Sequence, residues 1–373
     1  MTITTAALFV LGFFCLITGA DLLVRGASRI AAGLGISPLI IGLTVVSFGT
    51  SAPELAVSLG AVFSGQPDLG VGNVVGSNIC NVVLILGLSA SIAPLVVAQQ
   101  LVRLDVPLMI IGSVITWVLV SDGNISRLDG IILFAGALTY LAILWKKGRV
   151  ESPEVMAEYA AEYGNGKKRS IWRGVLNVSM VLGGLGMLVL GSQWLVEAAV
   201  TVARALGVTE LVIGLTIVAL GTSLPELATS AVASLKGERD IAVGNVVGSN
   251  IFNLHVVLGL TGAFSPSSIE VSGAALDFDF PVMLAVSIAC LPIFFNRYRI
   301  DRWEGVVFLL YYVAYITYQV VNATQPGLLP PQSTMMLWFL LPISIVTLLE
   351  LLLHARWRNH QRAHAALDEN GES

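Results

Sequence analysis

The sequence consists of apolar blocks of about 20 residues separated by short polar segments. A helix of about 20 apolar residues crosses the hydrocarbon core of a bilayer, so each block predicts a membrane-spanning helix. Ten blocks precede residue 322, and an eleventh follows it. The predicted spans lie at 5–31, 38–64, 70–96, 104–120, 129–145, 175–203, 211–235, 242–264, 280–296, 304–321 and 335–354.

The second feature of the pattern is an internal repeat. Residues 42–58 read GLTVVSFGTSAPELAVS, and residues 214–230 read GLTIVALGTSLPELATS. The phrase VGNVVGSNI follows each copy, at 71–79 and at 243–251. Both phrases recur at an offset of 172 residues, and 30 of the 52 positions that align around them are identical. This similarity indicates a duplicated unit.

The duplication divides the first ten spans into two sets of five. An odd number of spans per unit forces the second copy to insert upside down, as in many secondary transporters whose site lies near the midplane between the halves. We therefore expect an all-α integral membrane protein with two inverted five-helix repeats and an eleventh, C-terminal helix. The expected segments are a first repeat (1–145), a cytoplasmic connector (146–173), a second repeat (174–322), an outside loop with the extra helix (323–358) and a cytoplasmic tail (359–373).

Composition agrees with a polytopic membrane protein. The chain is 55% hydrophobic and 12% charged, with a mean hydropathy of +0.84, whereas soluble domains are about 25% charged. Its three cysteines show no zinc spacing or disulfide framework and are expected to be small buried apolar residues. The N-terminus lacks a basic region, so residues 5–24 are not expected to be a cleaved signal. We expect no nucleic acid, no cofactor and no obligatory protein partner.

Positive charge predicts the orientation of the spans, because cytoplasmic loops are enriched in Lys and Arg. With the N-terminus outside and the C-terminus inside, 18 of the 20 basic residues fall on the cytoplasmic side. Only Arg127 and Arg204 fall outside, and Arg25 has the least certain side because it lies close to the first span. We expect the membrane to be the plasma membrane or the bacterial inner membrane.

Each copy of the repeat places one carboxylate, Glu54 or Glu226, in the middle of an apolar stretch. A proline precedes each glutamate and removes the hydrogen bond to the carbonyl four residues earlier, at Gly49 or Gly221. Carbonyls, hydroxyls and a carboxylate within one turn are all oxygen ligands, which suit a hard cation such as Na⁺ or Ca²⁺. At membrane depth such irregular backbone is tolerated where it is buried or lines a cavity.

Helical spacing gathers further polar groups around the two carboxylates. They recur at intervals of three or four residues and therefore share one face of each predicted helix. The first copy contributes Ser47, Thr50, Ser51, Glu54 and Ser58, followed by Asn73, Ser77 and Asn81. The second copy contributes Thr222, Ser223, Glu226 and Ser230, followed by Asn245, Ser249 and Asn253. Ala219 replaces Ser47, so only its backbone carbonyl could bind a cation.

A purely structural interpretation of these groups competes with the ion-site interpretation. Serine and threonine in membrane helices often bond to their own backbone, and small residues often serve helix packing. A buried charge, however, costs about 2.5–3.5 kcal/mol at the bilayer centre, and no basic residue lies near the motifs to pair with it. Two such costs at repeat-related positions favour a functional site. Other polar residues are expected to be structural, namely His255, Asp21, Asp105, Glu197 and Glu350.

The charge of the site predicts an exchanger. One Ca²⁺ neutralises two carboxylates, as do two Na⁺, and a third Na⁺ leaves the loaded site positive. A site that accepts either load, but is costly to leave empty and charged, couples the transport of the two ions.

The motifs GTSAPE at 49–54 and GTSLPE at 221–226, each followed by GNVVGSN, resemble the calcium/cation antiporter superfamily, and most closely its prokaryotic sodium/calcium exchangers. The resemblance covers both repeats and, more loosely, residues 1–322. It implies ten core helices, with helices 2, 3, 7 and 8 enclosing the ions and with helices 1 and 6 long, tilted and sliding. The eleventh span departs from that pattern.

The resemblance also implies a set of ion ligands. It assigns Ca²⁺ to Glu54 and Glu226 with the backbone carbonyls of Thr50 and Thr222. Its sodium sites add Ser51, Ser77, Ser223 and Ser249, with backbone at Ser47 and Ala219, and Asn81 and Asn253 close the middle. Some relatives carry Asp at one of these last two positions, so the two asparagines argue against K⁺ dependence.

These observations predict an antiporter that exchanges Na⁺ for Ca²⁺ by alternating access and extrudes Ca²⁺ electrogenically. The alternative is an H⁺- or K⁺-coupled Ca²⁺/cation antiporter on the same scaffold. A cation channel fits inverted repeats and a carboxylate pair less well. An intramembrane enzyme is disfavoured because the sequence has neither H-E-x-x-H nor G-x-S-x-G.

Overall fold

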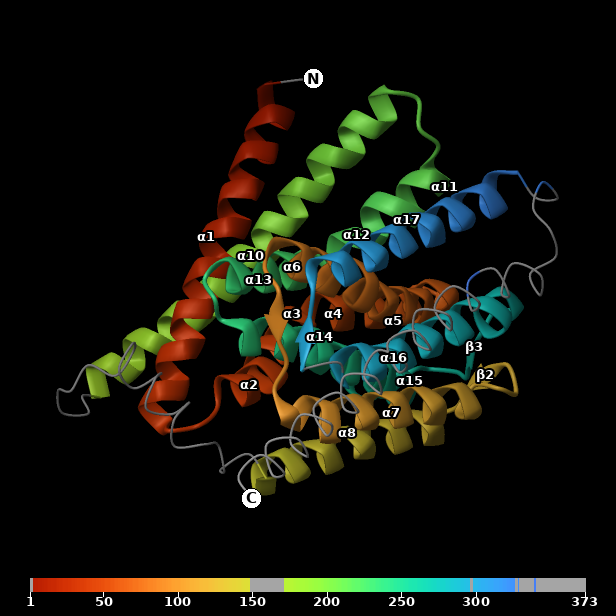
Figure 1. Cartoon of the computed structure of the whole chain (residues 1–373). Helices are drawn as coiled ribbons and strands as arrows, with labels where there is room; N and C mark the ends of the chain where they lie inside the picture. Colours follow the sequence, from red (N-terminus) through yellow and green to blue (C-terminus); the bar gives the residue numbers. More distant parts are fainter. Residues whose placement is uncertain (1–2, 148–170, 296–297, 326–327, 329–338, 340–373) are drawn as a thin grey trace, which may run out of the picture.

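The computed structural model describes residues 3–147, 171–295, 298–325, 328 and 339. Most of the predicted connector lies outside the described residues, as do the predicted eleventh span (except Phe339) and the tail. The two predicted halves can therefore be compared element by element (Figure 1).

The first half consists of five helical runs in the order of the predicted spans. Its elements are α1 (Ile3–Leu34); α2 (Pro38–Ile41), η1 (Gly42–Val46), α3 (Ser47–Thr50) and α4 (Ala52–Phe63); α5 (Pro67–Cys80), η2 (Asn81–Leu86) and α6 (Gly87–Ile92); η3 (Leu101–Asp105) and α7 (Val106–Leu119); and α8 (Arg127–Lys147).

The second half repeats this order. Its elements are α10 (Ile171–Ala205); α11 (Glu210–Ile213), η4 (Gly214–Val218), α12 (Ala219–Thr222) and α13 (Leu224–Leu235); α14 (Arg239–Phe252), η5 (Asn253–Leu258) and α15 (Gly259–Phe264); η6 (Ala275–Asp279) and α16 (Phe280–Phe295); and α17 (Arg302–Thr324). Short strands lie between runs, namely β1 (Leu95–Val96), β2 (Asn124–Ile125), β3 (Ile269–Glu270) and β4 (Arg299–Ile300).

The ten predicted spans before residue 322 are confirmed. Among the described residues, nine helices are long and apolar enough to cross a membrane, and a bent pair supplies the tenth. The bent pair joins Gly214–Thr222 to Leu224–Leu235 at an angle of 58°. The equivalent first-half run, Pro38–Phe63, counts as one span.

Local backbone irregularities recur at equivalent places in the two halves. Three π-helical turns, η1, η2 and η3, have counterparts in η4, η5 and η6. Such turns often occur at functional sites. The helix is also interrupted at Ser51 and at Ser223, one residue before the helix that carries the glutamate. The prolines therefore lie in the first turn of α4 and α13, where a missing N–H costs little, and not inside a continuous helix as the sequence suggested.

Two small β-ribbons show that the repeats are inverted. Strand β1, between the third and fourth spans, pairs with β4, between the ninth and tenth. Strand β2, between the fourth and fifth, pairs with β3, between the eighth and ninth. If both halves had inserted in the same direction, β1 would share a surface with its counterpart β3. We call the two faces the β1–β4 surface and the β2–β3 surface.

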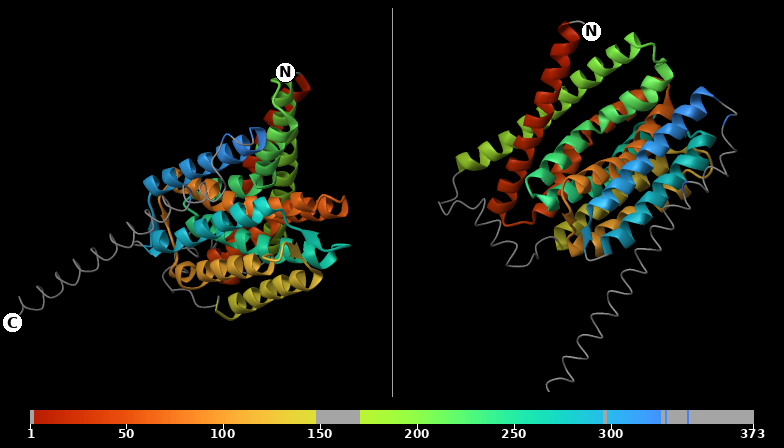
Figure 2. Two further views of the ribbon diagram at one scale, coloured as in Figure 1. Left: turned by 90° about the vertical axis from the view of Figure 1, so that its right-hand side faces the viewer. Right: turned by 45° about the horizontal axis from the view of Figure 1, so that its top comes forward.

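Helices α1 and α10 lie side by side and cross at one edge of the molecule, while the other helices form a bundle (Figures 1 and 2). Their backbones touch at glycine positions. A Cβ atom added to Gly19 would lie 2.8 Å from the carbonyl oxygen of Gly184, and one added to Gly12 would lie 2.9 Å from that of Gly191. Only glycine permits this approach, which packs the two long helices directly against each other.

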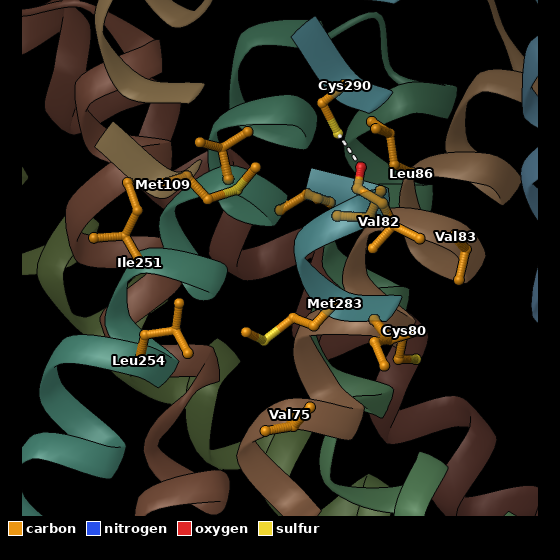
Figure 3. Close-up of a cluster of buried hydrophobic side chains, with 14 of the residues drawn as sticks. Val75, Cys80, Val82, Val83, Leu86, Met109, Ile251, Leu254, Met283 and Cys290 are labelled. Atoms are coloured by element: carbon orange, nitrogen blue, oxygen red, sulfur yellow. Dashed lines mark hydrogen bonds between the residues drawn. The ribbon is translucent and has the colours of Figure 1, made fainter. Parts of the chain in front are cut away.

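The apolar core lies between the two halves. Buried side chains from both repeats form one cluster, which includes Val75, Met109, Ile251 and Met283 (Figure 3). The Cys290 thiol in this cluster donates to the carbonyl of Val286 at 3.5 Å. The run Arg239–Phe264 is buried along its most apolar window. This packing holds the interrupted helices in the interior, where their polar groups face one another.

Candidate ion-binding site

Glu54 and Glu226 occupy the first turns of α4 and α13, and both are 0% exposed. The start of a helix carries partial positive charge, which stabilises a carboxylate there. The Ser223 hydroxyl donates to Oε1 of Glu54 at 3.3 Å, and the Ser51 hydroxyl donates to Oε1 of Glu226 at 3.4 Å. Each glutamate is therefore bonded to a serine from the other half, and this exchange builds one site from both repeats.

A second pair of bonds holds each interrupted helix to the opposite half. The Thr50 hydroxyl donates to Oδ1 of Asn245 at 3.2 Å, and the Thr222 hydroxyl donates to Oδ1 of Asn73 at 3.1 Å. Asn73 in turn donates through Nδ2 to the backbone oxygen of Glu54 at 3.2 Å. Asn245 makes the equivalent bond to Glu226 at 3.4 Å. These asparagines fix the backbone at both breaks.

The breaks also free backbone oxygens. Because the helix is interrupted at Ser51 and at Ser223, no backbone N–H four residues later bonds to the carbonyl of Thr50 or Thr222 among the described residues. The threonine side chains are committed to asparagines of the other half. The backbone oxygens of the two threonines are thus the groups at the break that could coordinate a cation.

The predicted site residues that follow in sequence differ between the halves. The Ser223 hydroxyl also donates to Ser77 at 3.1 Å, whereas Ser249, the counterpart of Ser77, has no partner among the described residues. Ser47 is buried and donates to the Gly42 carbonyl at 2.5 Å. Ala219 is exposed. The structure therefore brings Ser77 to the carboxylates but leaves Ala219 at the edge of the group.

Four asparagines meet in the middle of the molecule. Asn81 donates through Nδ2 to Oδ1 of Asn250 at 3.1 Å. Asn78 donates to the backbone oxygen of Asn250 at 3.2 Å. Asn253 is fully buried, and within the part of the chain described neither of its side-chain atoms has a partner. The bonds of Asn78 and Asn81 join α5 and η2 to α14.

Several buried oxygens in this region lack hydrogen-bond partners among the described residues. A buried polar atom without a partner costs free energy, so a cluster of such atoms needs an explanation. Carboxylate, hydroxyl and amide oxygens together are ligands for a hard cation. The unpartnered oxygens are Glu54 Oε2, Glu226 Oε2, Ser249 Oγ, Asn78 Oδ1, Asn81 Oδ1 and Asn253 Oδ1.

The charge of the two carboxylates is not balanced by a basic side chain. The ion pairs found among the described residues involve other acids, and none includes Glu54 or Glu226. Within those same residues, no group of three or more His, Cys, Asp or Glu could hold a metal. The site therefore suits a cation that binds two carboxylates with neutral oxygens, and not a metal that requires thiolate or imidazole ligands.

Some residues of this region were not assigned to the site from the sequence. The sequence places Asn73 and Asn245 on the polar face of their helices, but it does not show their contacts with the threonines of the opposite half. Asn78 and Asn250 lie in the repeated phrase VGNVVGSNI but were not predicted to take part in the site. Their signal is that the phrase is identical in both copies and places each asparagine three residues before Asn81 or Asn253.

The chain matches the family model described as sodium/calcium exchanger protein over residues 4–146 and 176–321. It is 41% identical to the putative antiporter CaxA of Alkalimonas amylolytica, over 83% of this chain and 97% of that protein. It is 34% identical to the sodium/calcium exchanger MaX1 of Methanosarcina acetivorans, over 83% and 96%. An inner membrane protein of Escherichia coli, YrbG, is 41% identical over 76% and 86%.

The fold is similar to that of a solved exchanger. The structure of the sodium-calcium exchanger NCX_Mj soaked with Na⁺ and Sr²⁺ superposes with a TM-score of 0.73 at 31% identity. The match covers 85% of this chain and 99% of that chain. The match thus extends over nearly the whole of that exchanger.

Proposed function

The chain belongs to the sodium/calcium exchanger protein family, a family of cation antiporters, and on that premise we propose that it exchanges Na⁺ for Ca²⁺ across a membrane by alternating access. The observation that carries the proposal is the pair of repeat-related, buried glutamates, each with one unpartnered oxygen. The relatives named as antiporters and exchangers support a transport function and not an enzymatic one.

The ligand set supports both ions. Ca²⁺ takes six to eight oxygen ligands, including carboxylates and backbone carbonyls. Glu54 and Glu226 with the carbonyls of Thr50 and Thr222 supply such oxygens. Serine and asparagine oxygens surround the same carboxylates and would complete the sodium sites, at Ser51, Ser77, Ser223, Ser249, Asn81 and Asn253.

Charge decides the electrical behaviour of the proposed exchange. Ca²⁺ neutralises the two carboxylates, whereas a load of more than two Na⁺ leaves the site positive. Exchange of these loads moves net charge, which couples transport to the membrane potential at about 2.3 kcal/mol per charge per 100 mV. The direction proposed is Ca²⁺ extrusion driven by the Na⁺ gradient.

The proposed orientation places the N-terminus outside and the C-terminus in the cytoplasm of a bacterial cell, in the inner membrane. It follows from the basic residues on one side and assigns the β1–β4 surface to the cytoplasm. A cysteine placed at Ser373 should resist an impermeant thiol reagent in intact cells, whereas a cysteine at Thr2 should react. Labelling at Ser373 would invert the orientation or remove the eleventh span.

The transport proposal is tested with ⁴⁵Ca²⁺ uptake into proteoliposomes. Uptake should require an imposed outward Na⁺ gradient and should change with a clamped membrane potential. An outward H⁺ or K⁺ gradient in parallel vesicles should not replace Na⁺. Uptake driven by H⁺ or K⁺ alone would establish the alternative antiporter, and uptake that ignores voltage would refute electrogenic exchange.

A further inference from the structure

The asparagines at the centre of the molecule break the symmetry of the repeat. Asn78 and Asn250 are equivalent positions, as are Asn81 and Asn253, and all four are at most 2% exposed. Asn81 donates to the side-chain oxygen of Asn250, but no equivalent bond joins Asn253 to Asn78 among the described residues. Asn81 and Asn253, the two asparagines assigned as ligands, therefore differ in whether a hydrogen bond holds the side chain.

The bond to Asn250 determines how Asn81 faces the site. A planar amide presents an oxygen at one side and an NH₂ group at the other, and only the oxygen can bind a cation. Nδ2 of Asn81 is engaged by Asn250 at 3.1 Å, and Oδ1 of Asn81 has no partner in the described part of the chain. Anchoring the nitrogen leaves the oxygen available as a ligand.

Asn250 is itself held in place by other elements. Its Nδ2 donates to the thioether of Met109 on α7 at 3.5 Å. Its backbone oxygen accepts from Nδ2 of Asn78 on α5 at 3.2 Å. Because Met109 engages the side-chain nitrogen of Asn250 and Asn78 engages its backbone, the side-chain oxygen of Asn250 is held toward Asn81.

We propose that Asn250 is a positioning residue for the transported cation, because it holds the amide of Asn81 with the carbonyl oxygen, and not the NH₂ group, turned toward the ion. The inference rests on the proposed function, which makes Asn81 an ion ligand. Partners that orient a metal ligand typically change metal affinity by 10–100-fold when they are removed. Asn253 has no such partner in the described part of the chain, so its amide is free to adjust to each ion.

The test is a double-mutant cycle on equilibrium ⁴⁵Ca²⁺ binding to the purified full-length protein. Asn250→Leu has a similar volume but cannot accept the bond, and it should weaken binding about 10-fold. Asn81→Ala should have a comparable effect. If Asn250 acts through Asn81, the double variant should be no more than about threefold weaker than Asn81→Ala alone.

The repeat supplies a matched control. Asn78→Leu and Asn253→Ala are the equivalent changes in the other half, where no bond joins the two side chains among the described residues. Their effects on ⁴⁵Ca²⁺ binding should multiply. Asn250→Asp keeps an acceptor oxygen and should bind Ca²⁺ at least as tightly as the wild type, although it loses the donor to Met109. Asn250→Ala replaces Asn250→Leu in the cycle if the leucine variant is not monodisperse.

Independent effects of Asn250→Leu and Asn81→Ala, or unchanged binding by folded Asn250→Leu, would overturn the positioning role. The proposed exchange fails differently. Intact Ca²⁺ binding and a coupled cycle, without Na⁺-driven uptake, would refute Na⁺/Ca²⁺ exchange and leave the role of Asn250 in place. A wild-type protein that binds no Ca²⁺ would overturn both.

Discussion

Helices α4 and α13 carry the same Pro-Glu-Leu-Ala sequence in the two halves but lie in different surroundings. On α13, three side chains pack against an apolar cluster that α1 supplies, namely Leu224, Ala228 and Val232. The cluster residues from α1 include Leu16, Ala20, Leu23 and Ala27. The equivalent α4 positions are all exposed, namely Ala52, Ala56 and Gly60. One glutamate helix is therefore covered by a long tilted helix, and its counterpart is not.

The sequences around the two glutamates are nearly the same, but Leu224 and Val232 of α13 stand where α4 has Ala52 and Gly60, so the covered helix also carries the larger apolar side chains. In an alternating-access transporter with inverted repeats, the two halves exchange conformations as the site opens to one side and then the other. On the proposed alternating-access mechanism, coverage of α13 by α1 would close the side of the site nearest the β1–β4 surface. The exposure of α4 leaves the opposite side less covered.

An ion pair reinforces the covered side. Lys236, at the end of α13, pairs with Asp21 of α1, and Arg25 pairs with the same carboxylate at 2.9 Å. The repeat-related positions are Ser64 and Gln193, which cannot form an ion pair. The pair of Asp21 and Lys236, which we call the latch, joins α1 of the first half to α13 of the second, and its repeat-related positions cannot form a second such pair.

The largest expected effect should be the same in the two halves, because each half contributes one glutamate. Glu54→Gln and Glu226→Gln each remove half of the negative charge of the site, so each should reduce ⁴⁵Ca²⁺ exchange by about 100-fold or more. The measurement is flux in proteoliposomes, with size-exclusion profiles as a control for folding. Normal exchange by either monodisperse variant would contradict the assignment of the site.

A smaller effect should distinguish the halves at the asparagines. Asn81→Asp cannot donate to Asn250 and places a carboxylate against its side-chain oxygen, so Ca²⁺ exchange should fall about 10-fold. Asn253→Asp breaks no bond among the described residues and should change the rate less than threefold. Equal losses in the two variants would mean that the bond seen in one half has no functional weight.

Removal of the latch should weaken the contrast between α4 and α13. Lys236→Ser introduces the first-half residue and breaks a half-exposed ion pair, of a kind worth about 1 kcal/mol or less. The apparent Ca²⁺ affinity should rise at the β1–β4 surface and fall at the other, with a combined change of about two- to fivefold. Right-side-out and inside-out vesicles measure the two affinities, and an unchanged ratio would show that the latch does not bias the states.

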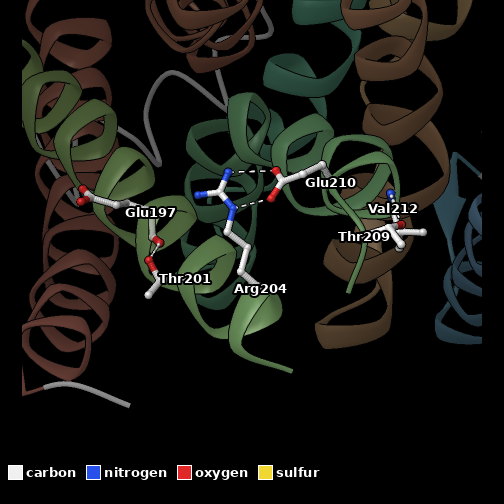
Figure 4. Close-up of polar contacts among 6 residues, drawn as sticks. All are labelled: Glu197, Thr201, Arg204, Thr209, Glu210 and Val212. Carbon is white, nitrogen blue, oxygen red and sulfur yellow. Dashed lines mark hydrogen bonds and ion pairs between the residues drawn. The ribbon is translucent and has the colours of Figure 1, made fainter. Parts of the chain in front are cut away.

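The smallest effect concerns an exposed pair in the second half, between α10 and α11. Arg204 donates to Oε1 and Oε2 of Glu210 at 2.6 and 2.9 Å (Figure 4). This bond lowers the pKa of Glu210 below its ordinary value of 4.5. Its contribution to stability is therefore complete above pH 4.5 and is lost as the pH falls through the lowered pKa.

Arg204→Gln should accordingly lower the melting temperature by about 2 °C or less at pH 7. The difference from the wild type should disappear at pH values below the lowered pKa. First-half Ala32 and Pro38 occupy the equivalent positions and offer no such pair. Thermal unfolding at the two pH values measures the effect, and a difference that grows as the pH falls would contradict it.

The sequence was sufficient to predict the first ten spans, the repeat and two carboxylates within apolar stretches, which are buried in the structure. Apolar length determines a span regardless of tertiary packing, and an offset of 172 residues is visible by alignment. The inversion followed from the odd number of spans and is confirmed by the ribbons β1–β4 and β2–β3. These features depend on local or periodic properties of the chain.

Contacts between the halves could not be read from the sequence. Helical spacing places Ser51 and Glu54 on one face, but the bond that Ser51 makes is to Glu226, and this depends on how the repeats dock. The sequence also did not predict that one helix ends at Thr50 and the next begins after Ser51. The position of this break depends on where the π-turn ends and on the place of the proline in the first turn of the next helix. The bond between Asn81 and Asn250 also has no signature in spacing, because its counterpart in the other half is absent from the described residues.

The two β-ribbons also restrict the mechanics of the transporter. Each ribbon joins one half to the other by backbone hydrogen bonds, and one ribbon lies at each surface. A rigid rocking movement of the first half against the second would break the hydrogen bonds of both ribbons. Neither ribbon includes α1 or α10, which touch each other at their glycines. A movement of α1 and α10 relative to the other helices would therefore leave the hydrogen bonds of both ribbons intact.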